Sequence, residues 1–255
     1  MNKKLISILL PCRERHERTI NLLKSIEDNT LVKDRVEVIS ITDFDRIDDF
    51  VNIAEFYNEG NISYNLYNIV RPRDNNLNKN YYNFGNLLSE AYFYWGLGND
   101  TEIVSLNWDE LLYEAVKDRL VDIDNDKAYF YVNINDDTHT HRKRDVINGN
   151  CFPIISQNFC KKVRGPFPDY ILSWGADVRL YDELKLVNGV EWINLNDCIK
   201  VEHFCHHTGK AEQDGVNKHI EAVYNSQKTG YKDNKGRNVS FRRSVQRLKE
   251  KAYLY

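Results

Sequence analysis

The first half of the chain alternates between short apolar runs and segments whose apolar residues recur at helical spacing. The apolar runs, which are typical of strands, are at residues 5–10, 36–42, 65–70 and 102–106. The segments with helical spacing lie between them, at residues 17–28, 46–57 and 81–95. Strands that alternate with helices form mostly parallel sheets, because each helix carries the chain back to the edge where the next strand begins. The pattern therefore predicts an α/β fold, with a Rossmann-like, mostly parallel sheet and helices on both faces.

The second half continues this pattern less regularly. A strand is expected at residues 127–135, and the polar stretch at 136–150 is expected to form a loop over a cleft. Further elements are expected at residues 151–163 (strand and helix), from residue 171 (helix), at 190–195 and 198–203 (strands), and at 218–227 (helix). We expect a single domain over residues 1–227 and a basic C-terminal tail over residues 228–255.

The composition is that of a globular protein with a sizeable core. The chain has 255 residues, of which 42% are hydrophobic, and this is enough for one large α/β domain. The net charge of -3 gives no overall attraction to nucleic acid or to anionic membranes. The five cysteines are scattered and lack a CxxC pair, so neither a disulfide framework nor a zinc ribbon is indicated. A reducing compartment fits this cysteine usage best.

The beginning of the chain superficially resembles a signal peptide, with lysines followed by an apolar run. That run is confined to residues 5–10 and ends at Pro11 and a charged block, so it is better interpreted as a first strand. No apolar stretch approaches the roughly 18 residues that cross a bilayer. We therefore expect a cytoplasmic protein without a transmembrane segment, peripheral to a membrane at most.

Polar residues directly follow the apolar run at 102–106. In open α/β sheets, ligands bind beyond the carboxyl ends of the strands. Asn107 and Asp109 are spaced to direct two oxygen atoms toward one hard divalent cation, which would neutralise phosphate charge on a substrate. Asn and Asp are also good N-caps, so the same residues could simply begin the following helix. Both interpretations stay open on these residues alone.

Three further polar groups are expected at strand ends or helix starts. Arg13 follows the first strand, Asp43 follows the second, and Asp177 opens a later helix. Each also has a structural interpretation, as a solvated charge, a helix cap and a partner of the helix dipole respectively. Trp174 suits packing or stacking against an acceptor. The joint occurrence of these groups, in this order, favours a functional site.

The order of these motifs over residues 4–215 resembles that of the GT-A glycosyltransferases, in particular the family 2-like group. That family has a proline- and arginine-containing loop after the first strand and an Asp after the second. A D-x-D or D-D-D motif ends its fourth strand, and an Asp or Glu precedes a later helix. The resemblance implies a GT-A domain that takes a sugar from a nucleotide-sugar donor.

The resemblance assigns the first two strand ends to the donor nucleotide. Pro11 and Arg13 would shape the nucleotide loop, and Asp43 would accept hydrogen bonds from the base. Asp45, two residues further on, joins these donor-binding candidates.

The resemblance assigns the metal and the catalytic base to later positions. Asp109 would hold Mn²⁺ or Mg²⁺ against the pyrophosphate, and Asp177 would remove the acceptor proton. This chain departs from the family at Asn107, which stands where the first acid of the triplet is usual. Asn107 remains a donor-site candidate, because its carbonyl oxygen can still bind a hard cation with one negative charge fewer.

A late cluster of imidazoles occupies residues 201–207, VEHFCHH. Its spacing does not match a structural zinc site, and no second Cys/His pair is near in sequence. The resemblance suggests that a late histidine completes the metal site, with His203 and His206 as candidates and His207 behind them. Lys210 could then contact a donor phosphate as a point charge.

The expected function is metal-dependent glycosyl transfer from a UDP- or GDP-sugar. A base that activates the acceptor for direct attack implies inversion at the anomeric carbon. One alternative is a degenerate GT-A domain that binds a nucleotide or a glycan without turnover. Another is a nucleotidyltransferase, although such enzymes usually have a Gly-rich loop after the first strand and PCRERHERT has no glycine.

The acceptor hypothesis rests on the tail. Residues 228–251 contain nine Lys/Arg and two acids in a chain that is acidic overall. Arg242 and Arg243 are therefore candidates to steer an anionic acceptor, such as a lipid-linked glycan or a nucleic acid. The alternative is that the tail is only a solvated terminus, and an acceptor glycan, a lipid-linked glycan and a nucleic acid all stay open as acceptors.

Overall fold

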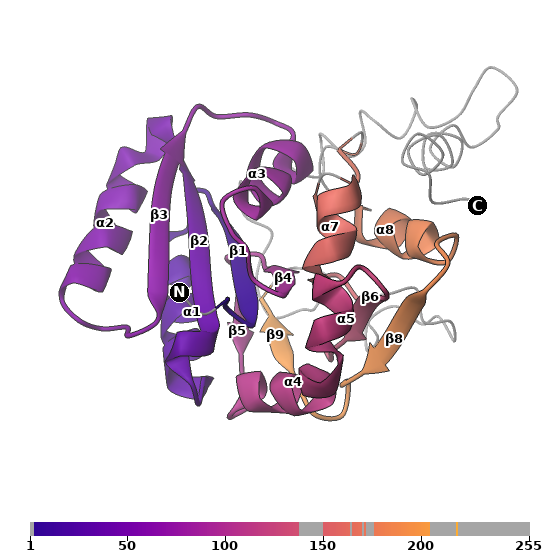
Figure 1. The fold of residues 1–255 in the computed structure, drawn as a ribbon. Helices are drawn as coiled ribbons and strands as arrows, with labels where there is room; N and C mark the ends of the chain where they lie inside the picture. The colour runs from indigo at the N-terminus through magenta and orange to yellow at the C-terminus, as the bar shows by residue number, and fades with distance from the viewer. Residues whose placement is uncertain are drawn as a thin grey trace, which may run out of the picture.

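The computed structural model describes residues 3–137, 150–163, 165–169, 171, 176–204 and 218. Its centre is a seven-stranded sheet (Figure 1). In spatial order the strands are β3 (Asn65–Arg71), β2 (Val36–Asp43), β1 (Ile6–Cys12), β4 (Phe93–Gly96), β7 (Ile154–Ser156), β6 (Tyr129–Asn133) and β8 (Val190–Asn194). All run in one direction except β7, which is antiparallel to both neighbours. A second sheet pairs β5 (Thr101–Ile103) with β9 (Val201–His203).

Helices cover both faces of the large sheet. The α-helices are α1 (His16–Asn29), α2 (Ile47–Asn58), α3 (Asn83–Asn86), α4 (Trp108–Val116), α5 (Leu120–Asp124), α7 (Gln157–Val163) and α8 (Ala176–Leu184). Shorter helical elements are η1 (Lys33–Arg35), η2 (Phe44–Arg46), η4 (Lys117–Arg119) and the π-helical turn η3 (Asn78–Tyr82). Residues of α1, α2, α4 and α5 belong to the core on one face, and residues of η3, α7 and α8 belong to the core on the other. The predicted α/β architecture is confirmed.

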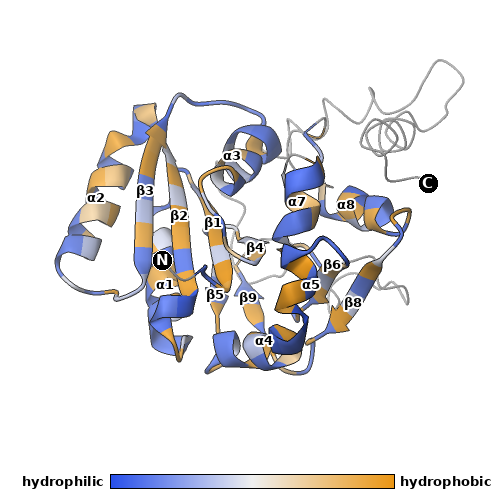
Figure 2. Ribbon diagram, in the orientation of Figure 1, coloured by the Kyte–Doolittle hydropathy of each residue, from blue (hydrophilic) through white to orange (hydrophobic). Residues whose placement is uncertain are grey.

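Strand β1 contributes to both cores. Ile8 and Leu10 face one core and Leu9 faces the other, because successive side chains of a strand point to opposite faces. Both β1 and its neighbour β2 are buried along their whole length, and Figure 2 shows mainly hydrophobic residues in them. A strand covered on both sides has no solvent-exposed face, which explains why Ile, Leu and Val dominate these two strands.

The helix expected over residues 81–95 is wrong in its second half. The helical part ends at Asn86, and Phe93–Gly96 forms β4 in the middle of the sheet. Phe93 and Trp95 enter one core and Tyr94 enters the other, so this aromatic run follows the two-residue period of a strand.

The parallel strand expected over residues 102–106 is also wrong. Only Thr101–Ile103 is a strand, and it lies outside the large sheet, antiparallel to β9. The chain has already left the central sheet at Gly96, so the polar residues that end the fourth strand come earlier than expected.

Parts of the sequence prediction fall beyond what the structure describes. These parts are most of the loop at 136–150, the helix at 218–227 apart from residue 218, and the basic tail at 228–255. Within the described residues, no helix combines the length and apolarity that crossing a membrane requires.

Gly96, the last residue of β4, allows two aromatic rings to approach the strand closely. A Cβ atom at this position would lie 2.8 Å from Phe167 Cε2 and 3.0 Å from Tyr82 Cδ1. The two rings also contact each other, with centroids 5.0 Å apart. This packing holds η3 over the end of β4, next to the polar residues that follow the strand.

We predict that Gly96→Ala lowers the free energy of unfolding by about 1–3 kcal/mol, because the added methyl group overpacks this contact. Urea denaturation measures the loss. In a Phe167→Leu background, Gly96→Ala should lower the free energy of unfolding by less, because the smaller leucine side chain leaves room for the added methyl group. An equal cost in both backgrounds would show that the Phe167 ring is not the obstacle.

Candidate functional site

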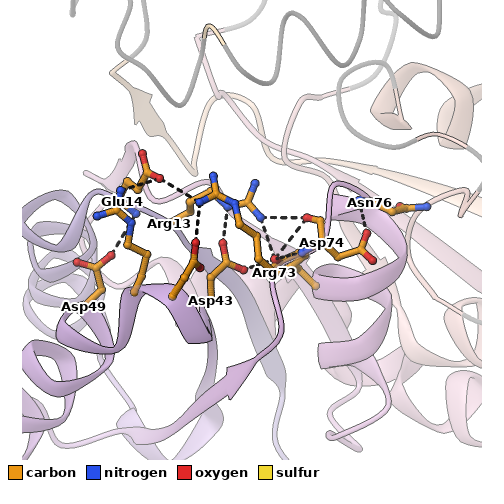
Figure 3. A network of polar contacts seen from close by, with 10 residues as sticks. Arg13, Glu14, Asp43, Asp49, Arg73, Asp74 and Asn76 are labelled. Atoms are coloured by element: carbon orange, nitrogen blue, oxygen red, sulfur yellow. Dashed lines mark hydrogen bonds and ion pairs between the residues drawn. The ribbon is translucent and has the colours of Figure 1, made fainter.

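The carboxyl ends of β1, β2 and β3 bring a buried ion pair to one edge of the sheet. Arg13 Nε donates a hydrogen bond of 2.5 Å to Asp43 Oδ2, and the Tyr81 hydroxyl donates to the other carboxylate oxygen. Arg13 Nη2 also donates to the Tyr81 hydroxyl at 2.9 Å and to the Asp74 carbonyl at 3.0 Å. Burial has the largest single effect and lowers the Arg13 pKa, but the hydrogen bond to Asp43 and the charges of Tyr81 and Asp43 together outweigh it, so the Arg13 pKa is raised. Figure 3 shows this network from close by.

Asp43 is fully buried, and both of its oxygens are engaged with donors of the protein itself. Its carboxylate therefore orients the partly exposed Arg13 and the buried Tyr81. Pro11, the other residue predicted for this loop, lies within β1, is buried, and pairs with Ile41 of β2.

Exposed charged residues next to this pair form ion pairs between the loops that follow β1, β2 and β3 (Figure 3). Glu14 has a left-handed backbone conformation, with φ of 54°, and its carboxylate lies 2.8 Å from Arg46 and 3.3 Å from Arg73. Arg73 also pairs with Asp45 at 3.0 Å, and this hydrogen bond lowers the Asp45 pKa. Asp45 thus lies at the carboxyl edge of the sheet, where Arg73 from the loop after β3 forms an ion pair with it.

Arg71 is a site residue that the sequence reasoning missed. It is the last residue of β3 and lies opposite Asp43 in the strand register. Its guanidinium stacks on the rings of Tyr81 and Phe84, with centroid distances of 5.3 and 4.9 Å. Its Nε and Nη1 atoms are buried and have no hydrogen-bond partner among the described residues. Buried donors normally have partners, so these two are suited to an acceptor from a ligand. A basic residue directly after an apolar strand was the available signal.

A second charged group follows β4. Arg15 Nη1 lies 2.9 Å from Asp100 Oδ2, and His203 Nε2 lies 3.6 Å from Asp100 Oδ1. Arg15 also donates to the Asn99 side-chain oxygen at 3.3 Å. Arg15, Asn99 and Asp100 are all less than one-tenth exposed. Burial works to raise the Asp100 pKa, but the hydrogen bond from His203 and the charges of His203 and Arg15 outweigh it and leave the pKa below its ordinary value.

Pairing of β5 with β9 places His203 in this group. Thr101 lies opposite His203 in the antiparallel register, and Phe204 N donates to the Asp100 carbonyl at 2.7 Å. His203 therefore lies beside Asp100, whereas the sequence predicted that it would share a metal with Asp109. Asn99 and Asp100 were missed because the aromatic run before them was interpreted as a helix.

The expected position of Asn107 and Asp109 at the end of a parallel strand is wrong. Asp109 is fully buried in the first turn of α4, and its two oxygens accept hydrogen bonds of 2.6 and 2.9 Å from Leu31 N and Val32 N. These amides belong to the loop that leads into β2, at the opposite edge of the sheet. Asn107 is exposed, with φ of 56°, and its N–H donates to the Asn29 carbonyl. Asp109 therefore connects α4 to this loop by two hydrogen bonds. It does not lie beside His203, whose acidic neighbour is Asp100.

Asp177 lies in the first turn of α8. Burial raises the pKa of Tyr131, and the negative charges of Asp177 and Asp136 raise it further. Tyr181, one turn along α8 from Asp177, packs on the Tyr131 ring with centroids 5.9 Å apart, so the predicted base lies on the helix that packs against β6. Five other candidates lie outside the described residues, namely Trp174, His206, Lys210, Arg242 and Arg243.

No protein-family model and no curated protein matches the sequence. Solved structures do match. The S. aureus TarS fragment 1–349 in complex with UDP has a TM-score of 0.53 at 14% identity, over 86% of this chain and 69% of that one. The mannosyltransferase PcManGT from Pyrobaculum calidifontis, in complex with GDP-Man and Mn²⁺, has a TM-score of 0.57 at 11% identity, over 99% and 76%.

GalNAc-T7 with UDP, GalNAc and Mn²⁺ has a TM-score of 0.56 at 14% identity, over 88% of this chain and 48% of that one. At such identities the likeness establishes the fold alone. The chain has the GT-A fold, as the order of its motifs predicted.

We predict that Asp109→Ala lowers the free energy of unfolding by about 1–3 kcal/mol, because two amides of the loop before β2 lose their charged acceptor. Asp109→Asn should cost less, since its side chain keeps one acceptor oxygen. Thermal and urea unfolding measure both, with the exposed Asp118→Ala as the control. A wild-type stability for Asp109→Ala would contradict this structural role.

Proposed function

We propose that the protein is a glycosyltransferase that moves a sugar from a nucleotide-sugar donor to an acceptor hydroxyl group. One observation carries the proposal: the Arg13–Asp43 pair and the Asp100–His203–Arg15 group lie at the same carboxyl edge of the sheet. Ligands of open α/β sheets bind at this edge. The solved neighbours include complexes with UDP, UDP-GlcNAc and GDP-Man, which supports a nucleotide sugar as the donor.

The first group suits the nucleoside end of the donor. The Nε and Nη1 atoms of Arg71, which have no partner among the described residues, would donate to carbonyl oxygens of the base. Asp43 would act on the base through Arg13, whose position it fixes together with Tyr81. Asp45 remains a proposed donor-binding residue, and the buried Pro11 would act only by holding the end of β1 from which the loop of Arg13 starts.

The second group suits the pyrophosphate and a divalent cation. Asp100 and His203 combine a carboxylate with an imidazole, a donor set that Mn²⁺ or Mg²⁺ accepts. Their separation of 3.6 Å is less than twice the roughly 2.1 Å ligand distance of Mg²⁺, so both can contact one ion. When bound, the ion would neutralise the charge of the leaving nucleoside diphosphate. His206 and Lys210 remain candidates to complete this set.

Asp177 is proposed as the general base. Its carboxylate would accept the proton of the acceptor hydroxyl as that oxygen attacks the anomeric carbon, and direct attack gives inversion. Arg15 would hold the Asp100 carboxylate in place and add positive charge near the departing phosphate. The acceptor would therefore enter from the side of α8, opposite to the nucleoside end.

A domain that binds a nucleotide without turnover is the second candidate. It is favoured by Arg15, which already donates a hydrogen bond to one oxygen of Asp100. Release of UDP or GDP from a panel of UDP- and GDP-sugars distinguishes turnover from binding.

We predict that Asp100→Ala abolishes Mn²⁺-dependent release of the nucleoside diphosphate, because the only carboxylate of the described metal group is removed. The measurement is a Mn²⁺ titration of donor hydrolysis, together with thermal shifts in UDP or GDP with and without Mn²⁺. Asp118→Ala, an exposed substitution remote from the site, should behave as wild type. Unchanged Mn²⁺ dependence in Asp100→Ala would exclude this metal assignment.

We predict that Asp177→Asn reduces kcat by about two or more orders of magnitude, the loss typical of a general base, while nucleotide binding persists. The change keeps the size of the side chain and removes its proton acceptor. Steady-state kinetics and UDP or GDP calorimetry test it. A wild-type kcat, or a loss of nucleotide binding, would show that the base is elsewhere.

A further inference from the structure

Three aromatic side chains form a connected cluster between α8 and the β6–β8 edge of the sheet. The ring centroids of Tyr131 and Trp192 are 4.8 Å apart, those of Tyr181 and Trp192 are 5.2 Å apart, and those of Tyr131 and Tyr181 are 5.9 Å apart. Tyr131 and Trp192 are direct neighbours in the parallel register of β6 and β8, and Tyr181 reaches them from α8. None of these residues has a role in the proposed donor site.

The cluster passes from the interior to the surface. Tyr131 is fully buried, Tyr181 is partly buried, and the Trp192 side chain is 41% exposed on the edge strand. Among the described tryptophans, Trp95 and Trp108 are completely buried, so Trp192 is the exposed one. An exposed indole on a rigid strand, braced from behind by two rings, presents a flat apolar surface to solvent.

This surface is continuous with Asp177. Asp177 and Tyr181 are four residues apart in α8, so their side chains share one face of the helix. The carboxylate is also close enough to the Tyr131 hydroxyl for its charge to raise the Tyr131 pKa. The aromatic surface therefore begins one helical turn from the proposed base and extends to the edge of the sheet.

We propose that Trp192 and Tyr181 form a saccharide-binding subsite that stacks a sugar ring of the acceptor. A pyranose ring has an apolar face of C–H groups and a polar rim, and it matches an aromatic side chain that is apolar on its face and polar at its tip. The identification of this saccharide as the acceptor rests on the proposed glycosyltransferase function. The binding of the saccharide itself does not.

Saturation-transfer NMR on the full chain tests the subsite with methyl glycosides of glucose, galactose, mannose and N-acetylglucosamine. At least one should receive saturation at its ring C–H protons. Its affinity should fall by about two- to tenfold in Trp192→Ala, the range expected for loss of one aromatic stacking contact. Trp192→Phe keeps a ring and should restore most of the binding. Tyr67→Ala removes a 48% exposed ring from the opposite edge strand, β3, and should leave binding unchanged.

The same samples are titrated with UDP and GDP, so that a failure of the saccharide subsite can be distinguished from a failure of the glycosyltransferase function. Saccharide binding that depends on Trp192, without any nucleotide binding, would keep the subsite and reject the glycosyltransferase function. Nucleotide binding with no saturation of any glycoside would overturn the subsite. Equal saccharide affinity in the wild type and a folded Trp192→Ala variant would also overturn it.

Discussion

The buried carboxylate of Asp43 is the interaction on which the donor side of the site depends. A carboxylate with no exposed surface is stable only when its charge and its oxygens are matched, and Arg13 and Tyr81 match both. The three residues come from the end of β2, the loop after β1 and the turn η3. Removing one partner of such a pair leaves an uncompensated charge, which typically costs about 3–5 kcal/mol. Arg13, Asp43 and Tyr81 therefore link three segments of the chain, and Arg71 packs on the ring of Tyr81.

The sequence predicted the elements whose local pattern has one interpretation. The segments at 5–10 and 36–42 are rich in Ile, Leu and Val, with Ser7, Glu37, Ser40 and Thr42 among them, and polar residues follow each. Strands β1 and β2 were therefore placed correctly. Asp177 was placed at a helix start because Gly165, Pro166 and Pro168 prevent an earlier helix. In each case the deciding signal lies within a few residues of the predicted feature.

The metal side could not be predicted in the same way. Apolar residues between Tyr81 and Trp95 satisfy a helical period, but the aromatic run within them also satisfies the period of a strand buried on both faces. Only packing against both cores decides between the two. The error moved the fourth strand along the chain, so Asn107 and Asp109 were expected after a strand that in fact ends at Gly96 and is followed by Asn99 and Asp100. His203 joins Asp100 through the β5–β9 pairing, for which no local signal exists.

The small β5–β9 sheet gives the protein a particular order of assembly. Asp100 and His203 are about one hundred residues apart in sequence, and closing a loop of that length is among the slower steps available to a chain. The Arg13–Asp43 pair closes a much shorter loop, of about thirty residues. The Arg13–Asp43 pair therefore depends on a contact that is closer in sequence, whereas the group around Asp100 is complete only when β9 pairs with β5. Bringing both groups to one edge requires a contact between segments about one hundred residues apart.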